Sequence, residues 1–333
     1  MDAAIESVAP PDTVDRLIAA GAAALGAAGV SAPRLDAEVL LAAAVGVDRT
    51  ALYARGRECL PPSRQHLFRA LLERRCAREP LQYIVGRQEF WSLDFAVTPD
   101  VLIPRPETEL LVELTVAMAA RGSASRSSGI PLLAKEGSGE VLKWRVSNLP
   151  LAPSLVRRGS IRGNEHDITI CDAGTGSGCI AVALATELPH AEIWALDMAP
   201  AALAVAQANA RRNRVADRIH FFASDLFTAV GGARFEAIVC NPPYVRAGAL
   251  PDLQPEIAWE PREAVVSGPD GLEVIRRLLV AAPGHLTDGG WLFVEIGADQ
   301  AESVESLARA ARFRRVSVHA DYAGLPRVVA AQR

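Results

Sequence analysis

The sequence of 333 residues is poor in cysteine and in aromatic residues, and it has no long apolar run. Its five cysteines are scattered and form no CxxC pair, so zinc-binding and disulfide frameworks are not expected. No stretch of about 18 uninterrupted apolar residues occurs, which predicts that no segment spans a membrane. The stretch MDAAIESVAPPD has no basic segment ahead of an apolar one, so we expect no secretory signal and a cytoplasmic protein.

Charge and aromatic content argue against a nucleic-acid substrate. The formal net charge is −4, and aromatic residues make up only 5% of the chain. Enzymes that act on nucleobases combine a basic groove with aromatic side chains on which the bases stack. We therefore expect no direct nucleic-acid substrate, although a local basic patch is compatible with this balance.

The chain is long enough for about two domains of roughly 100–200 residues each. Residues 12–80 place apolar side chains at helical spacing, which predicts an N-terminal α-helical bundle domain at residues 1–81. The next segment, QYIVGRQEFWSLDFAVTP, alternates apolar and polar residues in the manner of a β-hairpin. We therefore expect a hairpin linker at residues 82–105 and a second domain at residues 106–333.

Strand-like and helical segments alternate from residue 168 onward. This order predicts an α/β domain with a seven-stranded, mostly parallel, Rossmann-like sheet. Only the segment YAGL separates the last two strands, which is too short for a crossover helix, so the last strand should be antiparallel. The expected helices cover residues 178–188, 199–213, 271–283 and 298–312.

Residues 121–167 differ from the sequence on either side. They are rich in Gly, Ser and Pro, show no periodicity, and contain more basic than acidic residues. Long segments of this composition are usually disordered or functional. We expect a disordered insertion in the second domain; a basic arm that contacts RNA or the ribosome is the alternative.

The segment CDAGTGSGCIAVALA carries the strongest cofactor signal. A strand ends at Asp172, alternating glycines follow, and a helix begins, so that the backbone can approach a ligand closely. The dinucleotide fingerprint G-x-G-x-x-G fails because Cys179 takes its last position, which favours a ligand without a pyrophosphate. An ordinary turn between strand and helix is the alternative. The cofactor-binding candidates in this loop are Gly174, Thr175, Gly176, Ser177 and Gly178.

Acidic residues end the next two predicted strands. Asp197 closes IWALD, a position at which a carboxylate binds ribose hydroxyls, so it indicates a nucleoside cofactor without identifying it. Asp225 and Leu226 in ASDLF are expected to flank the adenine. The alternatives are a solvated acid at a strand end for Asp197 and a turn residue for Asp225.

The strand FEAIVC ends abruptly at the segment NPPY, residues 241–244. Proline has a fixed φ and no N–H, so the pair leaves a rigid backbone beside an amide and an aromatic ring. In open α/β sheets, ligands bind at this end of the strands. The catalytic and substrate-binding candidates are therefore Asn241, Pro242, Pro243 and Tyr244, and Asn241 is also a cofactor-binding candidate. A strand-terminating turn is the alternative.

In this order, the segments DAGTGSG, IWALD, SDLF and NPPY resemble a class I S-adenosylmethionine-dependent methyltransferase. NPPY narrows the resemblance to enzymes that methylate a nitrogen in a planar conjugated group. The segments PLQYIVGRQEFWSLDFAVTPDVLIPRPETELLVE and EPREAVVSGPDGLEVIRRLL resemble the N5-glutamine methyltransferases of peptide chain release factors, the PrmC/HemK family. The resemblance covers residues 12–120 and 168–333; the departures are the insertion and Leu226, where some relatives carry tryptophan.

The resemblance implies methyl transfer from S-adenosylmethionine to the N5 nitrogen of the glutamine in the Gly-Gly-Gln motif of release factors, on or near the ribosome. It also implies that the helical domain, together with the hairpin, binds the release factor. It also makes IPRPETE a wall of the cofactor and substrate pocket, with Phe90 beside the methionine part and Arg105 at the substrate. Arg105 can instead pair with Glu107 or Glu109, and two prolines with a threonine also suit a helix start.

The proposed roles of NPPY have a physical basis. The nitrogen of a glutamine side chain is a poor nucleophile because its lone pair is delocalised into the carbonyl. The Asn241 oxygen and the Pro242 carbonyl can accept its two N–H groups, which holds the amide and favours the positive charge that grows on nitrogen. Tyr244 packs against the flat amide. No strong general base is needed, because the cationic product loses its proton readily, and no metal is expected.

Four alternatives remain open from the sequence. The enzyme can act on another protein glutamine or on adenine in RNA or DNA. An NAD-dependent oxidoreductase is disfavoured by the missing dinucleotide glycine and by NPPY. A non-catalytic, cofactor-binding translation factor would have lost the asparagine or the prolines, and this chain keeps them.

Overall fold

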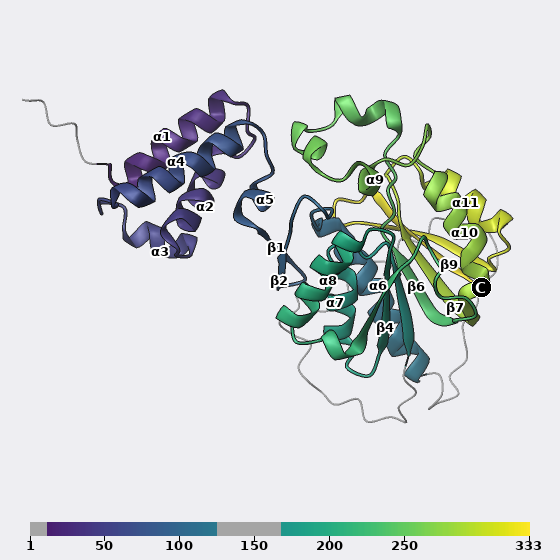
Figure 1. Ribbon diagram of the computed structural model, residues 1–333. Coiled ribbons are helices and arrows are strands. Elements are labelled where there is room, and N and C mark those ends of the chain that lie inside the picture. Colours follow the sequence, from purple (N-terminus) through teal and green to yellow (C-terminus); the bar gives the residue numbers. More distant parts are fainter. Residues whose placement is uncertain (1–11, 125–167) are drawn as a thin grey trace, which may run out of the picture. The chain divides into compact units, whose positions relative to one another are not determined.

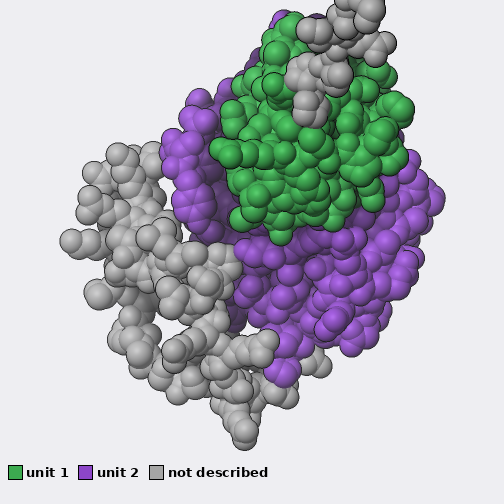
Figure 2. All heavy atoms as spheres, turned by 90° about the vertical axis from the view of Figure 1, so that its left-hand side faces the viewer, with its two compact units in different colours: residues 1–86, 254–259 green, residues 87–253, 260–333 purple. Residues whose placement is uncertain are grey.

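The computed structural model describes residues 12–124 and 168–333 of the chain (Figure 1). The chain divides into two compact units, coloured separately in Figure 2. One unit comprises residues 1–86 with 254–259, and the other comprises residues 87–253 with 260–333. Most of the insertion expected at 121–167 lies outside the described residues.

The first unit is a helical bundle. Prolines begin two of its helices, where the missing N–H would have had no partner within the helix. Residues 82–85, which we expected in the hairpin, belong to a short helix. Gly86 ends this helix in the left-handed conformation, with φ 73°, so the hairpin begins only after it. The helices are α1 (Val14–Ala27), α2 (Pro33–Val45), α3 (Arg49–Ala54), α4 (Pro62–Cys76) and α5 (Leu81–Val85).

A buried arginine on α4 holds a distant segment in this first unit. The Arg75 Nε donates to an oxygen of Asp36 at 2.8 Å, and its Nη1 lies 2.8 Å from a carboxylate oxygen of Glu256. Arg78 contacts the second oxygen of Glu256 at 2.7 Å. These pairs explain why residues 254–259, which form the 3-10 helix η4 (Pro255–Trp259), belong to the helical unit.

The second unit contains the seven-stranded sheet that the sequence predicts. The strand order is β5-β4-β3-β6-β7-β9-β8, and β9 is antiparallel to both of its neighbours, as expected. An antiparallel hairpin of β1 (Arg87–Phe90) and β2 (Leu93–Ala96) precedes this sheet. The strands are β3 (Thr169–Ala173), β4 (Glu192–Asp197), β5 (Ile219–Ala223), β6 (Phe235–Cys240), β7 (Leu286–Glu295), β8 (Arg315–Ala320) and β9 (Pro326–Gln332).

Helices cover both faces of the sheet (Figure 1). Along β6, Ala237 and Val239 pack with residues of α6 (Glu109–Ala124) and α7 (Cys179–Glu187), while Ile238 and Cys240 pack with α10 (Glu273–His285) and α11 (Ala301–Ala310). Burial on both faces explains why these strands are continuously apolar. The remaining helical segments are α8 (Pro200–Arg212), α9 (Arg262–Val265), η1 (Pro106–Thr108), η2 (Ala216–Arg218) and η3 (Ala247–Asp252).

Strand order reverses between β3 and β6, which lie side by side although β4 and β5 separate them in the chain. In doubly wound sheets such a reversal opens a crevice at the carboxyl ends of the two strands. The glycine loop follows β3 and NPPY follows β6, so both predicted motifs lie at this crevice. In the described part of the chain, no helix combines the length and apolar character that a bilayer crossing requires.

Replacing Arg75 with alanine should lower the free energy of unfolding of the helical unit by about 3–5 kcal/mol, because Asp36 keeps a buried charge without its partner. Urea unfolding followed by far-UV circular dichroism measures this loss. Arg69→Ala is the control, since the pair of Arg69 with Asp12 is about half exposed and should contribute about 0–1 kcal/mol. Equal losses in the two variants would contradict the role of Arg75.

Candidate active site

The carboxyl ends of β3, β4, β5 and β6 surround one cavity of about 170 Å³ in the second unit. The residues that line this cavity come from segments between Asp100 and Arg277, and the predicted site residues among them lie between Gly174 and Pro243. Gly178, Tyr244, Phe90 and Arg105 are not among its lining residues. The predicted residues that line it are Gly174, Thr175, Gly176, Ser177, Asp197, Asp225, Leu226, Asn241, Pro242 and Pro243.

The glycine loop has a backbone conformation that is unfavourable for residues with a side chain. Gly174, Gly176 and Gly178 have φ values of 78°, 53° and 79°, in the left-handed region that favours glycine. A Cβ at Gly174 or Gly176 would meet no atom of the described residues within 4 Å, whereas one at Gly178 would lie 2.9 Å from the Cβ of Ala206. The first two glycines therefore leave open space at the cavity, and the third permits close packing against α8.

Two hydrogen-bonded contacts fix the loop from outside. The backbone N–H groups of Gly174 and Thr175 both donate to the Leu196 carbonyl at 2.8 Å. The fully buried Asn209 on α8 donates its Nδ2 to the Ser177 carbonyl at 2.8 Å, and its Oδ1 accepts the Ala96 N–H at 2.8 Å. The role of Asn209 could not be predicted from the sequence, since an asparagine inside a helix has no local marker for a distant partner.

Asp172, at the end of β3, is a buried carboxyl group beneath the loop. One oxygen accepts the Thr175 hydroxyl at 2.6 Å and the Ala181 N–H at 3.1 Å, while Oδ1 has no hydrogen-bond partner among the described residues. Burial raises the pKa of Asp172 to about 7, against the two hydrogen bonds that lower it. A cationic group bound near this carboxyl would favour its ionised form.

Asp197 lies at the end of β4, next to Leu196, and also holds the loop. Its Oδ2 accepts the Gly176 N–H at 2.8 Å, and its Oδ1 accepts the Ala199 N–H at 2.9 Å. Each carboxylate oxygen can accept more than one hydrogen bond. Asp197 can therefore keep these contacts and still bind two neighbouring hydroxyl groups of a ribose.

Asp225 and Leu226 follow β5. The Asp225 carboxylate accepts a hydrogen bond from Arg277 on α10 at 2.6 Å, and both residues line the cavity. Leu226 has φ 47°, an uncommon conformation for a residue with a side chain, and its carbonyl accepts the Ser224 hydroxyl at 2.8 Å. The contact of Asp225 and Leu226 with adenine stays a prediction.

Asn241 belongs to a buried hydrogen-bonded chain. Its Nδ2 donates to the Thr108 hydroxyl at 3.1 Å, and that hydroxyl donates to Glu295 Oε2 at 2.7 Å. The Tyr244 hydroxyl donates to the other oxygen of Glu295 at 3.3 Å. Glu295 thus contacts one end of NPPY directly and the other end through Thr108.

The ionisation of this chain is set mainly by burial. Burial raises the pKa of Glu295 to about 7, although hydrogen bonds from Thr108 and Tyr244 and the charge of Arg327 lower it. The pKa of Tyr244 is raised by burial and by the neighbouring Glu295, so its hydroxyl keeps its proton at neutral pH. Glu295 was not a site candidate in the sequence, where the only signal is an acid closing the apolar strand WLFVE.

Two candidates from the family resemblance lie elsewhere. Phe90 is 1% exposed, packs edge-on against Phe95 in the core, and does not line the cavity. Arg105 pairs with the buried Glu260, and not with either of the acids that the sequence offered nearby. The contacts of Phe90 with cofactor and of Arg105 with substrate stay predictions.

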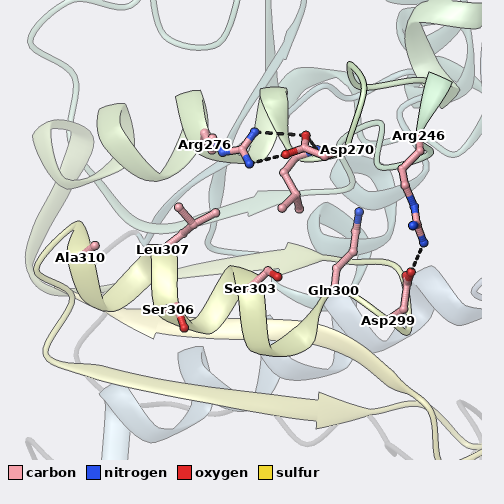
Figure 3. Close-up of a pocket in the computed structure, with 10 residues that line it drawn as sticks. Arg246, Asp270, Arg276, Asp299, Gln300, Ser303, Ser306, Leu307 and Ala310 are labelled. Atoms are coloured by element: carbon pink, nitrogen blue, oxygen red, sulfur yellow. Dashed lines mark hydrogen bonds and ion pairs between the residues drawn. The ribbon is translucent and has the colours of Figure 1, made fainter. Parts of the chain in front are cut away.

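A larger hollow of about 640 Å³ shares no lining residue with this cavity. Figure 3 shows that the charged side chains that line it pair with one another, Arg246 with Asp299 and Arg276 with Asp270. Its lining contains neither the glycine loop nor NPPY. The smaller cavity is therefore the candidate active site.

Two protein-family models and several curated relatives match the chain. The PrmC N-terminal domain model matches residues 16–86, and the methyltransferase small domain model matches residues 160–261. A Moorella thermoacetica protein named release factor glutamine methyltransferase is 41% identical over 310 residues, which are 93% of this chain and 94% of that protein. A Geobacter sulfurreducens protein of the same name is 40% identical over 302 residues, 90% of each chain.

A solved structure resembles the fold. The hMettl16 catalytic domain in complex with MAT2A 3′UTR hairpin 6 has a TM-score of 0.51 and covers 78% of this chain and 81% of its own. Its sequence identity is only 13%, so the likeness concerns the fold alone.

Two glycine variants separate backbone conformation from packing in the loop. Gly174→Ala should lower the free energy of unfolding of the second unit by about 1–2 kcal/mol, because only the left-handed conformation is opposed. Gly178→Ala should cost about 1–3 kcal/mol more, because its Cβ also overlaps Ala206. Chemical denaturation measures both, and an equal or smaller loss in Gly178→Ala would contradict the packing role.

Proposed function

The chain belongs to the release factor glutamine methyltransferase family, and we propose that it methylates the side-chain nitrogen of the glutamine in the Gly-Gly-Gln motif of peptide chain release factors. The methyl donor is S-adenosylmethionine. The observation that carries the proposal is that the glycine loop and Asn241-Pro242 line one cavity. A cofactor site and an amide-binding site are thereby adjacent.

The residues of the cavity fit S-adenosylmethionine, which supplies an electrophilic methyl group when it is bound. Gly174 and Gly176 leave space where any side chain would intrude, so they suit close contact between backbone and cofactor. Asp197 retains acceptor capacity for ribose hydroxyls. Asp172, which is buried beneath the loop and does not line the cavity, has an oxygen without a hydrogen-bond partner among the described residues, and its negative charge suits a cofactor that carries positive charge.

Asn241 and Pro242 promote the reaction by holding the substrate amide in one orientation. The Asn241 Oδ1 and the Pro242 carbonyl accept the two N–H groups of the glutamine amide, so that its lone pair faces the methyl group. The nitrogen becomes positive as it takes the methyl group, whose bond to sulfur breaks and leaves its electron pair on the sulfur, and two fixed carbonyl dipoles stabilise the charge on nitrogen. The product then loses one N–H proton. Tyr244, held by Glu295, packs against the flat amide.

The partner assignment extends beyond the site. The helical unit, together with the hairpin, grips the release factor so that its glutamine reaches Asn241. The reaction takes place in the cytoplasm, on or near the ribosome, with no direct nucleic-acid substrate. The net charge of −4 and the low aromatic content of 5% support a protein substrate over a nucleobase.

The substrate assignment is tested with isotope-labelled cofactor and a purified release factor. Label should enter the wild-type factor and not a variant whose Gly-Gly-Gln glutamine is changed to alanine, because only that amide fits between Asn241 and Pro242. Scintillation counting after gel separation reads the result. Equal labelling of both factors would show that the glutamine is not the acceptor.

The role of Asn241 is tested separately. Asn241→Ala should lower kcat by at least about 10²-fold, because an oriented carbonyl dipole is lost, while calorimetry finds cofactor affinity within about twofold of wild type. Asp197→Ala is the matched variant and should show the opposite pattern, with cofactor affinity lost first. Undiminished turnover in Asn241→Ala would remove the asparagine from the mechanism.

A further inference from the structure

An asparagine amide has two ends of similar shape and opposite hydrogen-bonding character. The oxygen accepts hydrogen bonds, whereas the NH₂ group donates them. Only the oxygen can bind an N–H group of the substrate, so the methyl transfer requires that Oδ1 of Asn241 faces the glutamine. The orientation of this amide must therefore be fixed by neighbouring groups.

Thr108 is the group that fixes it. The Thr108 side chain is 1% exposed and lies between Asn241 Nδ2, at 3.1 Å, and Glu295 Oε2, at 2.7 Å. A hydroxyl group has one hydrogen to donate. An ionised Glu295 only accepts, so the hydroxyl hydrogen points to the carboxylate, and Thr108 can only accept from Asn241.

The reverse orientation of the amide is costly in this arrangement. If Oδ1 of Asn241 faced Thr108, the hydroxyl would have two acceptors and one hydrogen, and one buried acceptor would stay unpaired. An unsatisfied buried polar group costs about 1–3 kcal/mol. The arrangement therefore directs the NH₂ group of Asn241 toward Thr108 and its oxygen away from it.

We propose that Glu295 acts through Thr108 as a positioning residue, which sets the direction of the hydrogen bonds and so turns the acceptor end of Asn241 toward the substrate nitrogen. This inference rests on the proposed function of Asn241. Glu295 also holds the other end of NPPY, since it accepts the Tyr244 hydroxyl at 3.3 Å. One buried carboxylate at the end of β7 thereby orients both polar side chains of the motif.

The direction of the hydrogen bonds depends on the charge of Glu295. When it is protonated, its hydroxyl can donate to Thr108, whose hydrogen then turns to Asn241 and stabilises the reversed amide. Burial raises the pKa of Glu295 to about 7, so this change falls near neutral pH. The ionised form is the active one, and its fraction grows as pH rises through that value.

The groups that face Glu295 come from several elements. Arg327 on β9 lowers its pKa, and Glu107 in η1 raises it. Tyr244 keeps its proton at neutral pH, because its own pKa is raised by burial and by Glu295. The thiols of Cys179 and Cys240 interact with Glu295 too, but burial keeps them neutral.

Substitutions at Thr108 test the transmission of this effect. Thr108→Val keeps the shape and removes the hydroxyl, and it should lower kcat about tenfold, or about 1.4 kcal/mol. Thr108 also lines the cavity, but valine keeps the shape of its side chain, so cofactor affinity by calorimetry should stay within about twofold. Thr108→Ser restores the hydroxyl and should recover kcat to within about twofold of wild type.

Thr115→Val is the matched control, because it also replaces a buried hydroxyl with a methyl group but lies outside the Asn241–Thr108–Glu295 chain. Thr115 is also fully buried, but its hydroxyl donates to the Leu111 carbonyl within α6. It should leave kcat unchanged. Full activity in Thr108→Val, or an equal loss in Thr108→Ser, would overturn the proposal.

Glu295→Gln tests the charge, and it decides the matter if Thr108→Val does not fold. At saturating cofactor, wild-type kcat should rise between about pH 6 and about pH 8, and the amide variant should lack this rise. Asp172 titrates in the same pH range and could change cofactor affinity, and saturating cofactor keeps such a change from affecting kcat. The same rise in Glu295→Gln, or a flat wild-type profile, would contradict the proposal.

A readout without turnover separates this inference from the proposed function. In ¹⁵N-labelled protein, the side-chain NH₂ signals of Asn241, assigned by their loss in Asn241→Ala, should shift in Thr108→Val and not in Thr108→Ser. If the wild-type enzyme labels no release factor but the signals behave in this way, the function is wrong and the orientation is right. Unchanged signals in Thr108→Val would refute the orientation itself.

Discussion

The reversal of strand order between β3 and β6 is the constraint on which the site depends. It makes neighbours of two strands that are separated in the chain by β4 and β5, and it places the glycine loop beside NPPY. In the proposed function neither motif is sufficient for methyl transfer, because the glycine loop is assigned to the cofactor and NPPY to the amide. Their common cavity is a consequence of sheet topology, and the apolar residues on both faces of the strands keep that topology in place.

The site at the ends of these strands contains buried polar groups joined by hydrogen bonds, each with a defined donor and acceptor. Asp197 accepts from the loop that follows β3, while Glu295 accepts from Thr108 and Tyr244. Buried hydrogen bonds of this kind fix side-chain orientation because the alternatives leave a donor or acceptor without a partner. The chemistry requires such orientation, since a glutamine amide has no free lone pair and must be turned and held.

The sequence predicted the parts of the fold that depend on local pattern. Alternating strand and helix signals identified the seven strands, and the short YAGL connection identified the antiparallel one. Local pattern could not reveal partners that are far apart in the chain, such as Thr108 and Glu295, which are separated by 187 residues. It also assigned residues 82–85 to the hairpin, whereas they belong to the short helix that Gly86 ends. Nor did it indicate that residues 254–259 belong to the helical unit, because the pair of Arg75 with Glu256 joins residues that are far apart in the sequence.

The most direct test of the account is a crystal structure of the enzyme with S-adenosylhomocysteine and a peptide that contains the Gly-Gly-Gln motif. Asn241 Oδ1 and the Pro242 carbonyl oxygen should each lie about 2.7–3.2 Å from the glutamine side-chain nitrogen, which should face the cofactor sulfur. A glutamine nitrogen beyond the reach of both oxygens, or facing the Nδ2 of Asn241, would contradict the account.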